Sequence, residues 1–489
     1  MANSNNLKQK AVSGMIWTSI QRFMGMGIQF ISGIILARLL MPEDYGAIGM
    51  LTIFMLVAQS FLDGGFGAAL IQKKRPNQND YSTVFWFNLV MSLFLYLILF
   101  VSAPFIAKFY RMPILCDVLR VQAIVLIISA LTIVQANQLN KTFQFKKVAL
   151  VTLITSIVSL IVTVWMAYAG YGVWALVAQG LLSSAIPSLI YWITGKWRPS
   201  FVFSVKSFRE LFSFGVFMFL TNMINEICNN VQGLLIGRVY SASTMGYYSK
   251  ARSTEKLASN TITQALKQVT FPLYSELQND KDGLILAIKK LTQLISFFTF
   301  PLMLILILLA EPIFVLLYSE RWLDSVPYFQ ILCLAGIPGC LQSVNLQSIA
   351  AIGKSKVSFW WTIIKRGIGL LLMIIGIEIW GMWGLLVGMV ISIWLMYLIN
   401  AYLVDVHIGY KMSRQLLDLL PTFLLSIIAF VISYFIGGLL SLGLYTNGII
   451  QMIIYMAVYL LGSKLFELQS FTYAMNLIRN NLLNKRNRS

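Results

Sequence analysis

The sequence has little charge, and acidic residues are especially few. Only 11% of the 489 residues are charged, whereas about 25% is usual for a soluble globular protein. So few charges cannot cover a water-exposed surface of this size, and long runs such as 297–309 are apolar with no polar partner face. The composition, which is 58% hydrophobic, argues against a soluble fold and favours an integral membrane protein.

Cysteine and histidine are also scarce. The cysteines at 116, 228, 333 and 340 show no CxxC spacing, so the sequence indicates neither a disulfide framework nor a zinc site. The single histidine, His407, lies in a predicted cytoplasmic loop and offers little for acid–base catalysis. We therefore expect no catalytic residues, no metal and no bound cofactor.

The charge that is present is mostly basic, with a formal net charge of +19. The lysines and arginines lie in short segments between apolar runs, which is the positive-inside pattern of membrane proteins. This distribution argues against nucleic-acid binding. It predicts that both termini are cytoplasmic, in a multi-pass protein of a bacterial inner membrane.

Apolar stretches of about 20 residues, bounded by charge, glycine or proline, recur along the whole chain. They predict an all-α integral membrane protein with about fourteen transmembrane helices and no extramembrane domain. The predicted spans lie near 12–37, 45–71, 82–107, 118–140, 148–169, 172–195, 211–237, 243–272, 287–310, 326–352, 357–379, 382–404, 415–438 and 446–466.

Two parts of the sequence are similar to each other. The segment 33–38, GIILAR, matches 233–238, GLLIGR, and Gly46 matches Gly246. A second match at nearly the same offset pairs Pro104, Tyr110, Gln122, Asn137 and Lys146 with Pro312, Tyr318, Gln330, Asn345 and Lys354. The matches predict two pseudo-symmetric lobes of about six helices each, related by an axis along the membrane normal, with the substrate path between them.

The repeat also sets the expected divisions of the chain. The segment 196–210 mixes aromatic and basic residues, which suits a stretch lying on the inner leaflet. The predicted divisions are an N-terminal lobe 1–195, an interfacial linker 196–210, a C-terminal lobe 211–404, two further helices in 405–466 and a basic cytoplasmic tail 467–489.

Polar side chains fall inside several predicted spans, where one charge costs at least about 2.5–3.5 kcal/mol. One helical stripe of the span 243–272 carries Arg252, Lys256, Ser259, Thr263 and Lys267. Other spans carry similar polar stripes. If all of these stripes face the predicted path between the lobes, they line a water-filled cavity with a net positive charge. The candidate substrate-binding residues are Arg22, Gln29, Asp63, Asn222, Asn229, Arg252 and Lys256.

Two further interpretations concern single charges. Lys250, Lys267, Lys365 and Arg366 can simply extend to the nearest membrane surface. Arg252 can be a structural partner of Glu255 or Glu226. Separately, Glu226 with Asn222 and Asn225 is a candidate site for a coupling ion, Na⁺ or H⁺, because Na⁺ prefers oxygen ligands.

Three segments of the sequence carry a family resemblance: 36–46 (LARLLMPEDYG), 63–72 (DGGFGAALIQ) and 245–249 (MGYYS). In these segments the chain resembles the Wzx-type polysaccharide-transporter branch of the superfamily that also contains multidrug exporters and the lipid II flippase. It implies a flippase that moves undecaprenyl-pyrophosphate-linked oligosaccharide from the inner to the outer leaflet by alternating access. The oligosaccharide would be a unit of O-antigen, capsule or exopolysaccharide, and polysaccharide polymerase or assembly proteins would be partners alongside membrane lipid.

The resemblance also implies roles for residues. Arginines on helices one, two and eight of the lipid II flippase face its cavity, and Arg22 and Arg252 are similar in position to those on helices one and eight. Asp63 departs from the pattern on helix two. Guanidinium groups suit pyrophosphate because they bind phosphate oxygens in pairs and stay charged, and amides such as Asn222 and Gln29 suit sugar hydroxyls.

Two other functions fit less well. An ion-coupled multidrug exporter of the same superfamily would need acidic residues in its cavity, whereas the first span offers Arg22 and no acid. A membrane enzyme such as an O-antigen polymerase or ligase would need a large periplasmic loop, which the spacing of the spans leaves no room for.

Overall fold

The computed structural model describes residues 2–440, 442–473 and 475–476. Within these residues the chain forms helices and turns, and none forms a strand. This is expected in lipid, where a backbone must satisfy its own hydrogen bonds. In chain order the helices are α1 (Ala2–Leu39), α2 (Pro42–Asp63), α3 (Phe66–Gln72), α4 (Gln78–Tyr110), α5 (Ile114–Gln122), α6 (Ile124–Lys141), α7 (Phe145–Tyr168), α8 (Val173–Thr194), α9 (Val205–Val239), α10 (Ala242–Glu276), α11 (Lys281–Leu308), α12 (Ala310–Tyr318), η1 (Glu320–Trp322), α13 (Ser325–Ala351), α14 (Ser355–Ile408), α15 (Met412–Leu440) and α16 (Leu444–Leu465).

Among the described residues, 11 helices are long and apolar enough to cross a membrane. The all-helical membrane fold is therefore confirmed, whereas the number fourteen is not. The predicted spans 357–379 and 382–404 correspond to the two parts of α14, which are separate helices because the backbone is non-helical at Trp380 and at Gly381, where φ is 60°. The predicted spans 211–237 and 243–272 correspond to α9 and α10, which are long helices but are not among the 11.

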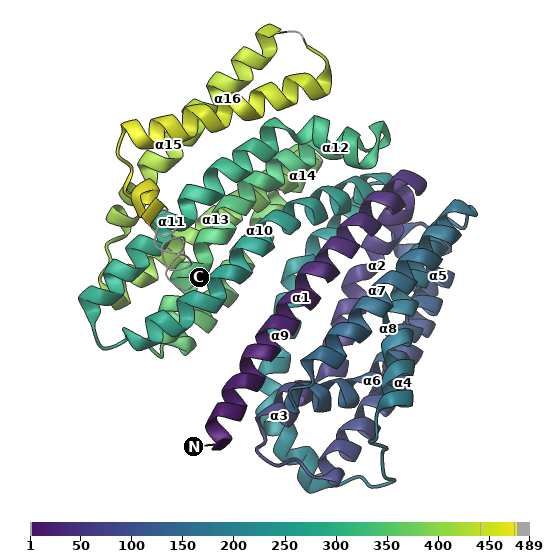
Figure 1. Cartoon of the computed structure of the whole chain (residues 1–489). Coiled ribbons are helices and arrows are strands. Elements are labelled where there is room, and N and C mark those ends of the chain that lie inside the picture. Colours follow the sequence, from purple (N-terminus) through teal and green to yellow (C-terminus); the bar gives the residue numbers. More distant parts are fainter. Residues whose placement is uncertain (1, 441, 474, 477–489) are drawn as a thin grey trace. The chain divides into compact units, whose positions relative to one another are not determined.

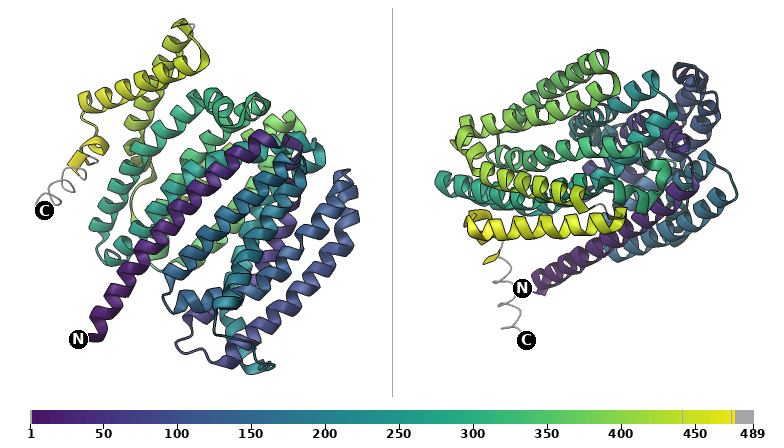
Figure 2. Two further views of the ribbon diagram at one scale, coloured as in Figure 1. Left: turned by 45° about the vertical axis from the view of Figure 1, so that its right-hand side comes forward. Right: turned by 90° about the horizontal axis from the view of Figure 1, so that it is seen from above.

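The chain divides into two compact units, Met1–Ser249 and Lys250–Ser489, and the division falls inside α10. In the first unit α1 packs along α7, α2 packs on α9, and α6 packs on α4 and α8. Figures 1 and 2 show α1, in purple, lying lengthwise beside the blue helices of this unit. In the second unit α13 packs on α11 and α14, and α15 and α16 lie side by side (Figure 1).

The two copies of the repeated glycine lie at one helix crossing within the first unit. A methyl group on Gly46 would overlap the backbone of Ala242, and one on Gly246 would overlap the backbone of Pro42. The contact is reciprocal, because Gly46 meets the residue four positions before Gly246, and Gly246 meets the residue four positions before Gly46. Beside it, Ser243 Oγ donates a hydrogen bond to Glu43 Oε1 at 3.0 Å. Glycine at both positions lets α2 and the first turns of α10 cross with their backbones in contact.

Helix α9 is held to the first unit at both of its ends. Near its start, Gly215 lies against the backbone of Gly65, which has a φ of 73° at the break between α2 and α3. Near its end, Arg238 Nη1 donates a hydrogen bond to the carbonyl of Phe109 at 2.8 Å. Gly237 lies against Tyr110 nearby.

The segment between α8 and α9 is tied to α4 rather than loose. Trp86 Nε1 donates to the carbonyl of Ser200 at 2.8 Å, and Gln78 Nε2 donates to the carbonyl of Arg198 at 2.7 Å. Phe201, in contrast, is 93% exposed. The Phe201 ring stacks on Trp86, with the ring centroids 5.1 Å apart. Fixed polar contacts together with an exposed aromatic ring suit the inner-leaflet position expected for 196–210.

Candidate substrate-translocation site

Helix α1 presents its candidate residues on a face that its own unit leaves open. Gln21 Nε2 donates to Thr152 Oγ1 of α7 at 3.0 Å, which fixes the orientation of the helix. Arg22, Gly25 and Gln29 follow at helical spacing, with Arg22 half-buried and Gln29 exposed. A methyl group on Gly25 would meet no atom within 4 Å. This face of α1 therefore has room for a ligand.

Asp63 is the last residue of α2, directly before two glycines with positive φ, Gly64 at 49° and Gly65 at 73°. Asp63 is exposed, and the side chain of Gln59, one turn earlier in α2, forms a hydrogen bond with its carboxylate. The carboxylate therefore sits at the point where the helix breaks, held by a neighbour on its own helix.

The amide residues of α9 form a polar middle section of that helix. Asn222 is exposed, and Asn225, Glu226 and Asn229 are half-buried. Asn230 Nδ2 donates to Glu226 Oε2 at 3.1 Å and to the Glu226 carbonyl at 2.9 Å. One oxygen of the candidate ion-binding carboxylate is thus engaged by an amide that the sequence interpretation had not included.

The second unit contains the remaining candidates, on α10. Arg252 is half-buried and Lys256 is exposed, while Glu255 between them is buried. Glu255 hydrogen-bonds with Ser259, and both Arg252 and Lys256 are close enough to act on its charge. Glu255 Oε1 also lies against Gly336 of α13, where only a glycine leaves space for it. The Lys267 side chain lies outside the residues whose side chains are described.

Lys250 does not extend to a membrane surface, so that interpretation was wrong for this residue. Its side chain is 5% exposed, and Nζ lies 4.0 Å from the centroid of the Tyr318 ring and 5.7 Å from that of Trp322. Thr254, one turn along α10, shares a hydrogen bond of 3.1 Å with the Tyr318 hydroxyl. Sequence alone could not find these partners because α12 and η1 are brought to α10 only by the fold.

Lys365 is likewise buried rather than extended to a surface. Its Nζ donates a hydrogen bond to Asn400 Oδ1, across the two parts of α14 that meet after the kink. Asn400 is a polar residue that the sequence interpretation missed. Its only signal in the sequence is that a single amide interrupts a long apolar run.

A cluster of charges joins α3, α4 and α9 at the end of the first unit that is predicted to be cytoplasmic. Lys73 Nζ lies 3.0 Å from Asp80 Oδ1 and 3.0 Å from Glu210 Oε2. Partial burial lowers the pKa of the Lys73 ammonium group, but the hydrogen bonds to Glu210 and Asp80 raise it by more. The pKa of Lys73 is therefore above its ordinary value. Lys141 Nζ adds a hydrogen bond of 2.7 Å to the carbonyl of Leu70. The cluster therefore fixes the start of α9 against α3 and α4.

The sequence model of the family described as "Polysaccharide biosynthesis protein" matches residues 35–327. Among curated relatives, the teichuronic acid biosynthesis protein TuaB of Bacillus subtilis is 26% identical over 73% of this chain and 74% of its own length. The succinoglycan biosynthesis transport protein ExoT of Rhizobium meliloti is 27% identical over 71% of each chain. The lipopolysaccharide biosynthesis protein WzxC of Escherichia coli is 22% identical over 89% of each.

Solved structures share the fold. The inward closed conformation of the lipid II flippase MurJ superposes with a TM-score of 0.74 at 20% identity, covering 93% of this chain and 98% of that one. An inward-facing multidrug resistance transporter of the MATE family gives a TM-score of 0.59 at 16% identity, covering 82% and 99%. At these identities the likeness shows the fold alone.

Proposed function

This chain belongs to the polysaccharide biosynthesis protein family of multi-pass membrane proteins, and from that premise we propose that it flips undecaprenyl-pyrophosphate-linked oligosaccharide from the inner to the outer leaflet. The proposal includes alternating access between the lobes 1–195 and 211–404, in a bacterial inner membrane with both termini cytoplasmic. Relatives named for teichuronic acid, succinoglycan and lipopolysaccharide biosynthesis support the substrate class.

The observation that carries the proposal is the open polar face of α1. A positive charge inside an apolar helix is costly, so Arg22 on a face with free space beside Gly25 indicates an anionic ligand. We propose that Arg22 and Arg252 hold the pyrophosphate, because a guanidinium group binds two phosphate oxygens in one plane. Gln29, Asn222 and Asn229 would hydrogen-bond the sugar hydroxyls, with Lys256 and Asp63 lining the path.

Coupling to an ion gradient belongs to the same proposal. We assign Glu226 with Asn222 and Asn225 to a coupling Na⁺ or H⁺, with no other cofactor. Because Asn230 engages Glu226 Oε2, the ion would be held through Oε1. Polysaccharide polymerase or assembly proteins would receive the flipped unit on the outer side.

A multidrug exporter is the second candidate, favoured by the MATE-type fold. An exporter of organic cations needs acidic side chains along its path, and α1 carries arginine and no acid. The charged side chains described on α10 and in the first part of α14 are mainly basic as well. This charge pattern favours an anionic cargo.

The test is complementation of surface glycan in a strain that lacks the gene, with membrane levels of each variant measured. We expect Arg22→Ala and Arg252→Ala to lose glycan and to accumulate lipid-linked precursor on the inner leaflet, and Arg→Lys at either position to fail as well. Arg120→Ala is the matched control, since Arg120 of α5 has no proposed role and its guanidinium carbon lies 4.3 Å from the centroid of the Phe100 ring in α4. Normal export from the double variant Arg22→Ala, Arg252→Ala would rule out the mechanism.

A further inference from the structure

The end of the first unit that is predicted to be cytoplasmic carries a strongly basic surface. Two segments of the chain form it, 73–80 and 196–210, which together contain seven lysines and arginines but two acidic residues. Lys73 of the first segment pairs with Glu210 of the second at 3.0 Å. The charges of both segments therefore lie at the same end of the unit.

Two of the seven basic side chains are used within the protein. Lys73 bridges Asp80 and Glu210, which are the two acidic residues of these segments. Arg198 donates to three backbone carbonyls, and its guanidinium carbon lies 5.2 Å from the centroid of a Trp192 ring. The other five, here named the basic surface, are all exposed, and among the described residues none of them forms an ion pair: Lys74, Arg75, Lys196, Lys206 and Arg209.

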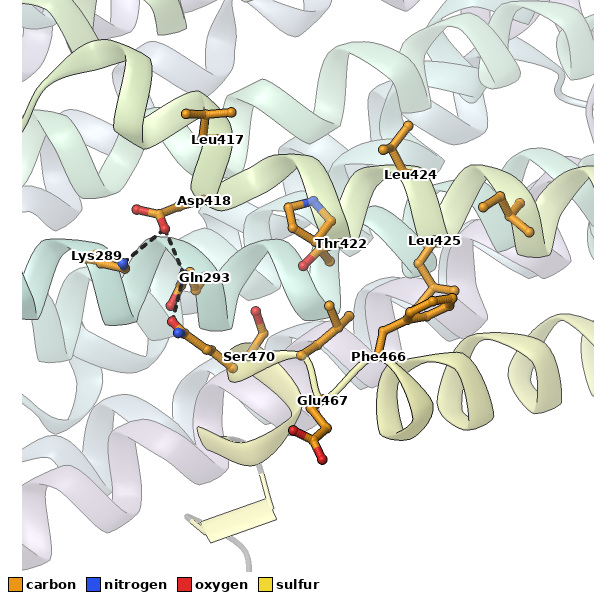
Figure 3. A pocket seen from close by; sticks show the side chains of 14 residues that line it. Lys289, Gln293, Leu417, Asp418, Thr422, Leu424, Leu425, Phe466, Glu467 and Ser470 are labelled. Carbon is orange, nitrogen blue, oxygen red and sulfur yellow. Dashed lines mark hydrogen bonds and ion pairs between the residues drawn. The ribbon is translucent and has the colours of Figure 1, made fainter.

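A lysine whose charge is satisfied inside the protein has different surroundings. In the second unit, Lys289 Nζ lies 3.1 Å from Asp418 Oδ1, and Gln293 Nε2 donates to the same oxygen at 3.1 Å (Figure 3). Lys73 is held in a similar way by two carboxylates. No carboxylate of the described residues lies within ion-pairing distance of the basic surface, so its charges are available to an external anion.

Exposed apolar side chains lie in the same segment as three of these cations. Phe201 is 93% exposed, Phe203 50% and Val205 63%. The Ser200 carbonyl, directly before them, accepts a hydrogen bond from Trp86, so their backbone is fixed to α4. A contiguous exposed apolar patch beside basic residues is typical of a surface that lies at the boundary between lipid headgroups and acyl chains.

We propose that the basic surface binds anionic phospholipid headgroups of the phosphatidylglycerol type in the inner leaflet, while Phe201 and its neighbours enter the boundary with the acyl chains. A phosphate group offers oxygen acceptors to lysine and arginine donors, and basic clusters beside membrane helices are attracted to anionic leaflets. The proposal does not rest on the proposed function. It adds a class of lipid to the inner-leaflet position expected for 196–210.

The experiment is native mass spectrometry of the purified full chain, titrated with dioleoyl phosphatidylglycerol or dioleoyl phosphatidylcholine. The two lipids have the same acyl chains, but phosphatidylglycerol is anionic and phosphatidylcholine has no net charge. We expect phosphatidylglycerol to bind about tenfold more tightly, and the preference to shrink as salt is added. The double variant Lys206→Gln, Arg209→Gln should reduce the preference by about threefold or more, and so should Lys74→Gln, Arg75→Gln.

The control removes the same charges from the other end of α4. Lys108→Gln, Arg111→Gln takes away one exposed lysine and one exposed arginine, as Lys206→Gln, Arg209→Gln does, and it should leave the preference unchanged. An equal loss in the control would show that net charge alone attracts the lipid, and the proposal would be wrong.

Two other results would overturn the proposal. Equal binding of the two lipids by the unaltered protein would refute it without any variant. A preference that survives both basic-surface variants would place the lipid elsewhere. If undecaprenyl pyrophosphate alone bound in a way that depends on these residues, with no preference for phosphatidylglycerol, the surface would belong to the cargo instead.

Discussion

The reciprocal glycine contact predicts a measurable loss of stability when either glycine becomes alanine. A Cβ on Gly46 would lie 2.7 Å from the carbonyl carbon of Ala242, and a Cβ on Gly246 would lie 2.6 Å from that of Pro42. Unbonded carbons need about 3.5 Å, so each Cβ is too close to the carbonyl carbon by about 0.8–0.9 Å, and the carbonyl oxygens of Ala242 and Pro42 are nearer still. Both obstacles are backbone atoms, which cannot rotate away as a side chain could. The two helices must therefore separate at the crossing.

Overpacking of this kind typically costs about 1–3 kcal/mol, and we expect the upper part of that range because the obstacle is backbone. Thermal unfolding in detergent should show a midpoint lower by a few degrees for Gly46→Ala and for Gly246→Ala. The double variant should be less destabilised than the sum of the two, because one separation of the helices relieves both overlaps.

Gly180 of α8 provides the control, since a methyl group there meets nothing within 4 Å. Alanine in an open helical position is expected to be neutral or to stabilise by about 0.5–1 kcal/mol. If Gly46→Ala proved as stable as Gly180→Ala, the backbone contact between α2 and α10 would not exist in the folded protein. Strict additivity of the two glycine variants would refute the shared crossing.

Three other predictions test single regions. Lys73→Met should lower the free energy of unfolding by about 1 kcal/mol. The fold raises the pKa of Lys73, so its ion pairs stabilise the protein fully below the ordinary lysine pKa of 10.5. This stabilisation is lost as the pH rises through the raised pKa of the folded protein. An effect that persists at strongly alkaline pH would contradict this. Lys250→Ala should lower the thermal midpoint by several degrees, since it removes both the aromatic contact and buried volume, and an unchanged midpoint would count against it. In intact cells lacking Cys116, single cysteines introduced in 73–80 should be protected from an impermeant thiol reagent, whereas those introduced at 111–117 should react. The reverse labelling pattern would show that the membrane orientation is opposite to the predicted one.

The succession of membrane helices could be predicted from the sequence because lipid imposes the same requirement on each span. An apolar run of sufficient length is enough to predict a helix, and α2, α4, α7 and α11 all follow this rule. The break predicted near 380 is present as well, since Trp380 and Gly381 leave the helical conformation there and divide α14 into two helices.

For the candidate site, the sequence could predict the helix and the helix face on which a residue lies, but not the residues that it contacts. Spacing placed Arg22 and Gln29 on one face of α1, and the structure leaves that face open. Spacing could not place Lys250 against Tyr318, or Asn230 against Glu226 in preference to Asn222, because those pairings depend on helix packing and on rotamers. The contacts of Gln293 could not be predicted either, because its amide nitrogen donates to Asp418 and to Gln469, which only the packing of the helices brings to it.

The attachment of α9 at both ends limits how that helix can move. Lys73 and Gly65 hold its start, and the Phe109 carbonyl holds Arg238 near its end. Mechanically the helix is a rod with two fixed supports, so it cannot tilt as a rigid body unless one support breaks. With both intact, a change of shape must be a curvature of the part between them. That part carries Asn222 to Asn230, where the amide side chains can hydrogen-bond backbone groups that a bend would release.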